Sequence, residues 1–496
     1  MMSEPKRMHP AAMILNLISG VINIVKQIVI PFAFIFFVNS NAMIQFFALL
    51  GLAVLLIVVI VFSVLQWRKF TYRIEEDELR IEEGLIRKKR RYIPIERIQS
   101  VNTSEGIIQQ LFKLVKLQVE TAGGGKESEV SLKAITKHEA ERIQKELFDR
   151  KQKISSEEIQ TDVNTEEELE SLVQNLENEA DVTYKMGAKE LFIAASTSSG
   201  IGVIISGIVA FVTQFDEILP IERIYERFSF LNNAGLEVYA LLVFIGLIIA
   251  WILSMIGVLL KYANFTVIRK NKEIIISKGL IEKNRVTIPM HRIQAIKIKE
   301  NLIRQPLKYA TVMIVSAGGS ESEKNTSTLL FPVIPKKMVR ELLQQYVEGY
   351  TYETDITPLP ARSLRRYLIR YGFFPLIAGI LLSIFLSPWG YLGLLLIPVS
   401  LLLGYFAYKD AGWNLTGDKL QMTYRDIGKT TAIVLRKKMQ IYEVKQTYFQ
   451  KKNKLATIHT STKSSVTAES FSITDTEWED AQALFQWYSY EKRVNG

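Results

Sequence analysis

The chain has 496 residues, 48% of them hydrophobic, and its 61 Lys and Arg residues against 51 Asp and Glu residues give a formal net charge of +10. This length exceeds what a single hydrophobic core usually holds, so we expect several domains. Cysteine is absent, which excludes disulfides, thiol catalysis and thiolate metal sites. The histidines lack the spacing of metal ligands and predict no metal site: His9, His138, His291 and His459.

Long apolar segments alternate with charged regions, which is the pattern of a membrane protein with soluble domains. A transmembrane helix needs about 20 predominantly apolar residues, and six segments meet this requirement. They form three pairs, each followed by a charged region: 14–38, 42–66, 191–213, 236–260, 370–387 and 389–408. No cleavage site follows the first apolar segment, so we expect it to be retained as a span. The surplus of cations then favours an anionic membrane surface over nucleic acid as a partner.

Lys and Arg residues cluster at one end of each pair of spans, whereas segments 39–41 and 387–390 at the opposite ends carry no charge and segment 214–235 is acidic overall. Positively charged ends of spans stay in the cytoplasm. Both termini and all three charged regions are therefore predicted to be cytoplasmic, in a multi-pass protein of the cell membrane. The flanking cations are Lys6, Arg7, Arg68, Lys69, Lys261, Arg362, Arg365, Arg366, Arg370 and Lys409.

The first span carries a polar stripe made of Asn16, Ser19, Asn23 and Lys26, which fall on one face of a helix. Such a face avoids lipid. It either lines a hydrophilic crevice or a seam against another subunit, or it makes hydrogen-bonded contacts within the helix bundle. Coupled transporters usually bury several ionisable residues, whereas only Lys26 lies deep in a span here.

A short phrase occurs twice, as IPIERIQSV at 93–101 and IPMHRIQAI at 288–296, and the match without gaps extends from Phe70 to Gly124 at an offset of 195. A third, divergent copy at 434–462 follows at an offset of 341. We therefore expect one module of two spans and one soluble domain, repeated three times. The repeat-motif residues, to which we assign structural roles, are Pro94, Arg97, Gln99, Gly123, Gly124, Pro289, Arg292, Gln294, Gly318, Gly319 and Gln440.

Each soluble region has the alternation of apolar and polar residues that is typical of strands. The glycine-rich segment 121–128 joins two strands, so we interpret it as a hairpin turn and not as a phosphate cradle. A helix is predicted to close each region, at Lys137–Arg150, Pro335–Tyr350 and Asp475–Lys492. The last has an apolar stripe suited to covering a small barrel, formed by Trp478, Ala481, Leu484, Phe485 and Tyr488.

Paired spans followed by Gly-Leu-Ile, Ile-Pro, Arg-Ile-Gln and Ala-Gly-Gly segments resemble the bacterial pleckstrin-homology (PH) family, in particular its long members with three PH-like domains. The apolar segments and this resemblance together predict a polytopic α-helical membrane protein with six transmembrane helices in three hairpins. The resemblance also implies three cytoplasmic PH-like β-barrels of seven antiparallel strands, each capped by a C-terminal helix. The expected divisions are transmembrane pairs at 1–66, 185–262 and 353–408, PH-like domains at 67–152, 263–352 and 409–496 (divergent), and an acidic linker at 153–184.

Basic clusters in these regions are candidates for binding an anionic membrane surface or an acidic partner, at about 1 kcal/mol per charge. The alternative is that these basic side chains are only exposed to solvent on a strand and bind neither a membrane nor a partner. The acidic stretch 155–181 is expected to be a tether or an exposed helix, which can dock on these strands. The candidates are Arg87, Lys88, Lys89, Arg90, Arg91, Lys283, Arg285, Arg436, Lys437 and Lys438.

Enzyme motifs are absent, so we predict no catalytic residues and no cofactor. We expect a non-enzymatic membrane scaffold whose PH-like domains bind each other, anionic lipids of the inner leaflet or a partner protein, without nucleic acid. The resemblance further implies a smaller PH-like membrane companion in a hetero-complex and a role in tolerance to membrane-active antimicrobial peptides (bacteriocin resistance). The alternative is a membrane transporter or exporter component that uses the polar face of the first span.

Overall fold

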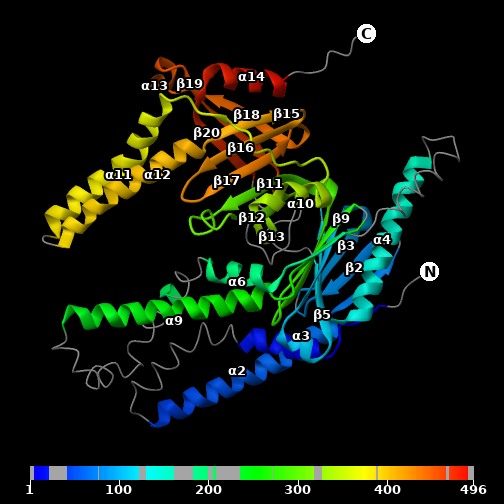
Figure 1. Cartoon of the computed structure of the whole chain (residues 1–496). Coiled ribbons are helices and arrows are strands. Elements are labelled where there is room, and N and C mark those ends of the chain that lie inside the picture. Colours follow the sequence, from blue (N-terminus) through cyan, green and yellow to red (C-terminus); the bar gives the residue numbers. More distant parts are fainter. Residues whose placement is uncertain are drawn as a thin grey trace. The chain divides into compact units, whose positions relative to one another are not determined.

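The computed structural model describes residues 5–21, 42–75, 77–85, 87–121, 130–160, 182–198, 205–207, 235–270, 272–317, 327–386, 389–464 and 468–489 (Figure 1). Two compact units divide the chain. The first comprises Met1–Glu179 with Ile281–Thr287 and Ser320–Ser322, and the second comprises Ala180–Leu280, Ile288–Gly319 and Glu323–Gly496.

Four helices among the described residues are long and apolar enough to cross a membrane. They are Gln45–Lys69 in α2 (Ala42–Lys69), Glu237–Tyr262 in α9 (Leu236–Tyr262), α11 (Ser363–Phe385), and Gly390–Asp410, which joins the 3-10 segment Trp389–Leu395 to α12 (Leu396–Asp410). The predicted first and third spans are described only in part, as helix Ala11–Val21 and α6 (Ala188–Ser196). Most of their remaining residues lie outside the described ranges, so the number of six spans stays a prediction.

The first compact unit packs two three-stranded meanders around an apolar core. Strands β1, β2 and β3 form one sheet, and β4, β5 and β6 follow one another in the other. The core contains fully buried Leu79, Ile95, Leu117 and Ile143. The elements are β1 (Thr71–Glu75), β2 (Glu78–Glu83), β3 (Lys89–Pro94), β4 (Ile98–Glu105), α3 (Ile107–Leu111), β5 (Leu114–Thr121), β6 (Val130–Thr136) and α4 (Lys137–Gln160).

The second compact unit holds most of the second repeat and the whole third repeat. The strands and short helices of its soluble regions, in chain order, are β7 (Val182–Lys185), β8 (Thr266–Lys270), β9 (Glu273–Lys278), β10 (Lys283–Pro289, whose first residues belong to the first compact unit), β11 (Ile293–Glu300), β12 (Tyr309–Ser316), β13 (Thr328–Pro335), α10 (Val339–Tyr346), β14 (Thr357–Pro358), β15 (Gly412–Thr416), β16 (Lys419–Arg425), β17 (Lys429–Leu435), β18 (Met439–Lys445), α13 (Tyr448–Lys452), β19 (Leu455–Thr462), β20 (Glu469–Glu477) and α14 (Trp478–Ser489).

The second and third repeats share one sheet. Its seven strands run in the order β13-β12-β11-β17-β16-β15-β14. Both edges of β11 are occupied, by β12 of its own repeat and by β17 of the next. We expected each repeat to close a separate seven-stranded barrel. Instead, each repeat contributes one meander before its corner turn and one after it, and the second meander of the second repeat continues into the third repeat.

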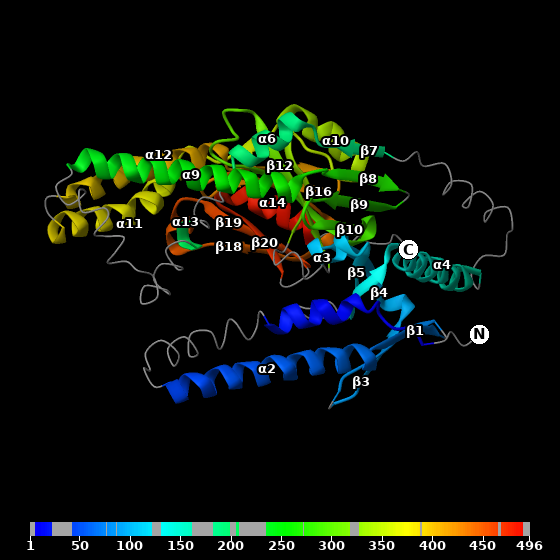
Figure 2. The same ribbon diagram turned by 90° about the horizontal axis from the view of Figure 1, so that it is seen from below.

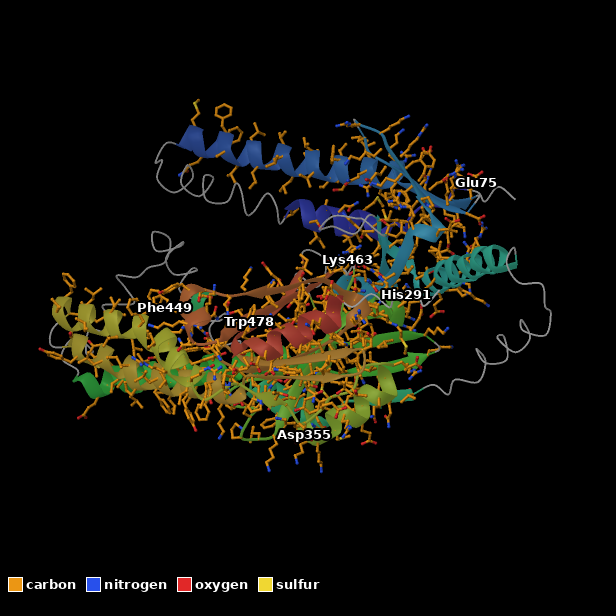
Figure 3. All side chains as sticks on the ribbon, turned by 90° about the horizontal axis from the view of Figure 1, so that it is seen from above. Glu75, His291, Asp355, Phe449, Lys463 and Trp478 are labelled. Carbon is orange, nitrogen blue, oxygen red and sulfur yellow. The ribbon has the colours of Figure 1, made fainter. Side chains whose placement is uncertain are left out.

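The closing helices differ in their bounds from the prediction. Helix α4 continues to Gln160, beyond the expected end at Arg150. Strand β20 extends through Asp475 to Glu477, and α14 begins only at Trp478, which Figure 3 labels. Figure 2 shows α14 beside β18, β19 and β20, which it contacts. Ala481 and Leu484 of the predicted stripe are buried, whereas Phe485 is exposed.

Candidate functional site

The repeated phrase forms the corner between the two meanders of each repeat. A 3-10 turn occupies this corner at Ile95–Arg97, Met290–Arg292 and Arg436–Lys438. Pro94 and Pro289 precede the first two turns with φ of −58° and −63°, which is the range that the proline ring imposes. The phrase therefore directs the chain from one sheet to the next, which is a structural role.

Arg292 holds its corner by hydrogen bonds to the main chain. Its side chain is buried and Nε donates to the carbonyl of Ala317 at 2.9 Å, while the amide of Ala317 donates to the carbonyl of Arg292 at 3.0 Å. Gln294 Nε2 also donates to this carbonyl, at 3.1 Å. In the other repeats Arg97 and Gln440 are exposed. The side chain of Gln99 and the glycines Gly123, Gly124, Gly318 and Gly319 lie outside the described part of the chain.

The basic cluster of the first repeat lies on β3 and the turn before it. Arg87, Lys88, Lys89 and Arg90 are exposed. Arg90 and Arg91 lie 3.5 Å and 2.9 Å from carboxylates of β2, those of Glu82 and Glu83. Such half-exposed ion pairs are worth about 1 kcal/mol or less, so this strand keeps a basic surface. Lys283 and Arg285 are exposed on β10.

The basic cluster of the third repeat is used partly for packing. Arg436 Nη2 donates to the carbonyl of Tyr488 at 3.1 Å, at the end of α14, and its guanidinium lies 5.8 Å from the centre of the Trp487 ring. Lys438 Nζ donates to the carbonyl of His291 at 2.6 Å, and burial together with the neighbouring Lys437 lowers the pKa of Lys438. Of the three cations only Lys437 is exposed.

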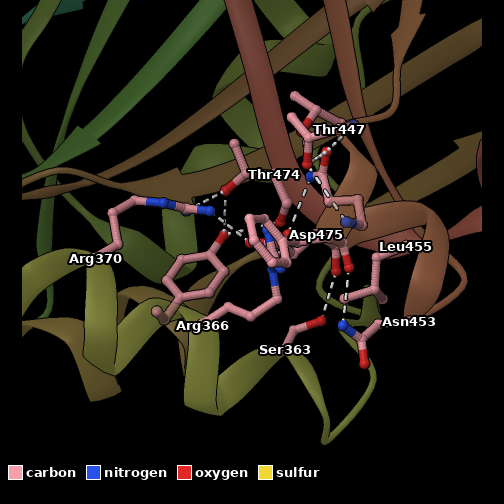
Figure 4. Close-up of polar contacts among 12 residues, drawn as sticks. Ser363, Arg366, Arg370, Thr447, Asn453, Leu455, Thr474 and Asp475 are labelled. Carbon is pink, nitrogen blue, oxygen red and sulfur yellow. Dashed lines mark hydrogen bonds and ion pairs between the residues drawn. The ribbon is translucent and has the colours of Figure 1, made fainter.

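A buried carboxylate joins the span helix α11 to the third β-domain. Asp475 of β20 is inaccessible to solvent and has a positive φ of 61°. Its carboxylate accepts hydrogen bonds from Arg366 Nε at 2.7 Å, Arg370 Nη2 at 2.5 Å and Gln450 Nε2 at 3.0 Å (Figure 4). The two guanidinium groups neutralise the buried charge, which otherwise costs several kcal/mol.

Further hydrogen bonds extend this junction along the first two turns of α11. Ser363 Oγ donates to the carbonyl of Asp475 at 2.6 Å, and the Tyr367 hydroxyl donates to the carbonyl of Thr474 at 3.1 Å. Arg362 Nε donates to the carbonyl of Asn453 at 2.8 Å. Because charge-assisted bonds are directional and strong, this end of α11 and the β-domain form one rigid element. We call the set of contacts around Asp475 the α11 junction.

A second junction lies in the loop between β11 and β12. The side chain of Arg304 is buried, and its Nε donates to Thr197 Oγ1 at 2.8 Å. Its Nη2 lies 3.4 Å from the carbonyl of Ala194, near the carboxyl end of α6, where carbonyls lack partners within the helix. A cation at this end is also favoured by the helix dipole. Arg304 therefore fixes the start of the predicted third span to the second β-domain.

The polar stripe of the first span is described only at its beginning. Asn16 is buried and its Oδ1 accepts a hydrogen bond from Lys133 Nζ of β6 at 2.9 Å. Ser19 Oγ donates to the carbonyl of Leu15 at 2.8 Å. Asn23 and Lys26 lie outside the described ranges. The contact of Asn16 with the β-domain favours a packing role for this part of the stripe.

Both junctions were missed at the level of the sequence. Arg366 and Arg370 were used only to orient the spans, and Asp475 was assigned to the start of a helix. The repeat offsets give one indication of the junctions. Arg304 and Gln450, which each take part in one junction, occupy the same repeat position, that of Gln109 in the first repeat. Across the described part of the chain, no group of three His, Asp or Glu side chains is placed to hold a metal ion.

Comparisons with known proteins agree with the repeat structure. The family model described as Bacterial PH domain matches residues 24–151, 211–349 and 364–492. The UPF0699 transmembrane protein YdbT of Bacillus subtilis (strain 168) is 52% identical over 495 residues, which are 99% of each chain. No solved structure matches the chain. Each matched segment includes a long apolar helix and the β-strands that follow it.

Proposed function

The chain belongs to the bacterial PH domain family, and we propose that it acts as a non-enzymatic membrane scaffold. Its PH-like domains bind further PH-like domains and the anionic lipids of the inner leaflet. The proposed architecture has six transmembrane helices in three hairpins, with both termini and all three PH-like domains in the cytoplasm. The cations at the ends of the described spans, such as Lys69, Lys261 and Lys409, support this orientation.

The α11 junction is the observation that carries the proposal. It holds a β-domain directly against the start of a span, and two guanidinium groups of that span compensate the buried charge of Asp475. The oxygens of the Asp475 carboxylate accept hydrogen bonds from Arg366 and Arg370 of the span helix and from Gln450 of the β-domain. The arrangement is therefore suited to fixing the position of a domain at the membrane surface.

The proposal includes a protein partner. The scaffold associates with itself or with a smaller PH-like membrane protein, and the resulting complex contributes to tolerance of membrane-active antimicrobial peptides. The family resemblance and the presence of several PH-like domains in one chain support this part. An export path along the first span is disfavoured because Asn16 bonds to Lys133 of the β-domain.

Lipid retention tests the membrane-surface part of the proposal. The full-length protein, purified in mild detergent, is expected to retain anionic phosphatidylglycerol in preference to phosphatidylcholine. Replacing the exposed residues Arg87, Lys88 and Lys89 by glutamine is expected to reduce this preference several-fold, because each cation near the surface contributes about 1 kcal/mol. The difference should shrink at high salt, where surface charges are screened.

The matched control replaces three exposed lysines on other elements, Lys145, Lys272 and Lys337, by glutamine. This variant has the same net charge as the first but should retain lipids like the unmodified protein. Equal retention in all three proteins, measured by mass spectrometry of the extracted lipids, would show that the basic strand does not bind the membrane.

A further inference from the structure

Neighbouring repeats are joined by the same strand pairing at both internal borders. In the first compact unit β4 pairs antiparallel with β10, with Glu105 opposite Lys283. In the second compact unit β11 pairs antiparallel with β17, with Glu300 opposite Lys429. Glu300 is the counterpart of Glu105 at the offset of 195, and Lys283 and Lys429 are both counterparts of Lys88. The two borders therefore have an identical register.

Each end of the chain carries one half of this pairing. Strand β3 is the counterpart of β10 and β17, and it is the outer strand of the sheet β1-β2-β3. Strand β18 is the counterpart of β4 and β11, and it is the outer strand of the sheet β18-β19-β20. Within the described strands, no further strand follows on these two edges. An outer strand presents backbone groups that can pair with another chain.

Side-chain exposure distinguishes the outer edges from the internal borders. Tyr92 of β3 is 54% exposed, whereas its counterparts Thr287 and Ile433 are 9% and 0% exposed. On the complementary strand, Ile441 of β18 is 54% exposed, whereas its counterparts Ser100 and Ala295 are 7% and 0% exposed. Two large apolar side chains thus lie uncovered at the positions that the internal borders bury.

We infer that β18 of one copy pairs with β3 of a second copy, in the register of the two internal borders. This inference rests on the proposed scaffold function and names the surface through which the scaffold assembles. The register places Ile441 opposite Ile93, Glu443 opposite Arg91 and Lys445 opposite Lys89. The opposite charges of Glu443 and Arg91 favour cross-strand pairing. A shift by one residue would turn every side chain of one strand to the other face of the sheet.

A second copy is the occupant because one chain carries both complementary strands. Cations on β3 such as Lys89 and Arg90 disfavour indiscriminate pairing of this edge, as charged edges usually do. The spans hold all copies in one membrane plane. A head-to-tail contact of this kind uses different surfaces on the two partners, so it generates a closed ring or an open row of copies.

Cysteine cross-linking tests the inference, and the natural chain offers a background without cysteine. Two differently tagged full-length copies are produced together, one with Lys445→Cys and the other with Lys89→Cys. Opposed residues of antiparallel strands have Cα atoms about 4.5–5.5 Å apart, which permits a disulfide. Oxidation of membrane vesicles with copper phenanthroline is expected to link most of the limiting copy into a species that carries both tags.

The control pairs Lys445→Cys with Arg90→Cys, whose side chain points to the opposite face of β3. It should give at least several-fold less of the linked species. The inference is overturned if the two pairs link equally, if neither links, or if the chain with both Lys445→Cys and Lys89→Cys forms only a disulfide within one copy. Retention of phosphatidylglycerol is measured on the unmodified protein, which keeps all cations of β3, so failure of the strand pairing is distinguished from failure of the scaffold function.

Discussion

Replacing Arg366 and Arg370 together by methionine is expected to destabilise the second compact unit by about 3–5 kcal/mol. The reason is that the substitution removes both cations from the buried carboxylate of Asp475 and leaves the hydrogen bond from Gln450 Nε2. Methionine keeps most of the side-chain volume, so the expected loss of stability is due to the removal of the two positive charges. In thermal unfolding of the detergent-solubilised protein, the loss corresponds to roughly 10 °C in Tm.

Two comparisons make this prediction specific. Arg365 is exposed on the same turn of α11, so Arg365→Met should change the stability by less than about 0.5 kcal/mol. Adding Asp475→Asn to the double variant should recover part of the loss, because it removes the uncompensated charge. A double variant as stable as Arg365→Met, or a triple variant less stable than the double, would argue against the α11 junction.

The substitution Ile433→Ala is expected to cost about 2–5 kcal/mol, the usual effect of removing a fully buried branched side chain. Ile433 lies in β17 of the third repeat and is opposite Ile296 of the second repeat. Its loss should therefore loosen both repeats together. Hydrogen exchange followed by mass spectrometry is expected to become faster in β11 as well as in β16 and β17.

The same chemical change at an exposed position of the same repeat gives the control. Ile427 is exposed in the turn between β16 and β17, so Ile427→Ala should cost much less and leave exchange in β11 unchanged. Faster exchange confined to the third repeat in Ile433→Ala would mean that the shared sheet does not couple the two repeats.

The sequence was sufficient to predict the modules and their order. Apolar segments of sufficient length predicted the helices α2, α9 and α11, and the repeated phrase predicted equivalent domains. The backbone supports the divergent third copy, because Lys113, Lys308 and Lys454 occupy one repeat position and have φ of 54°, 58° and 52°. Length, periodicity and internal similarity are local signals, so they can be read without knowledge of tertiary contacts.

The shared sheet and the junctions could not be predicted in the same way. The pairing of β11 with β17 depends on backbone groups more than 100 residues apart. Because the backbone groups of nearly all residues are alike, the sequence does not indicate which of them pair. Asp475 was placed at the start of the predicted helix 475–492, whose apolar stripe begins only at Trp478. The positive φ and the buried ion pairs of Asp475 arise only when α11 packs against β20. Residues 22–41, 199–204 and 208–234, which contain much of the predicted first and third spans, lie outside the described ranges.

Membrane sidedness tests the central claim most directly, because the scaffold requires all three PH-like domains on the cytoplasmic side. Single cysteines at exposed positions, Lys88→Cys, Lys272→Cys and Lys437→Cys, place one probe in each repeat. A maleimide that cannot cross membranes is expected to leave all three unlabelled in intact cells and to label all three after permeabilisation. Labelling of any one of them in intact cells would contradict the account.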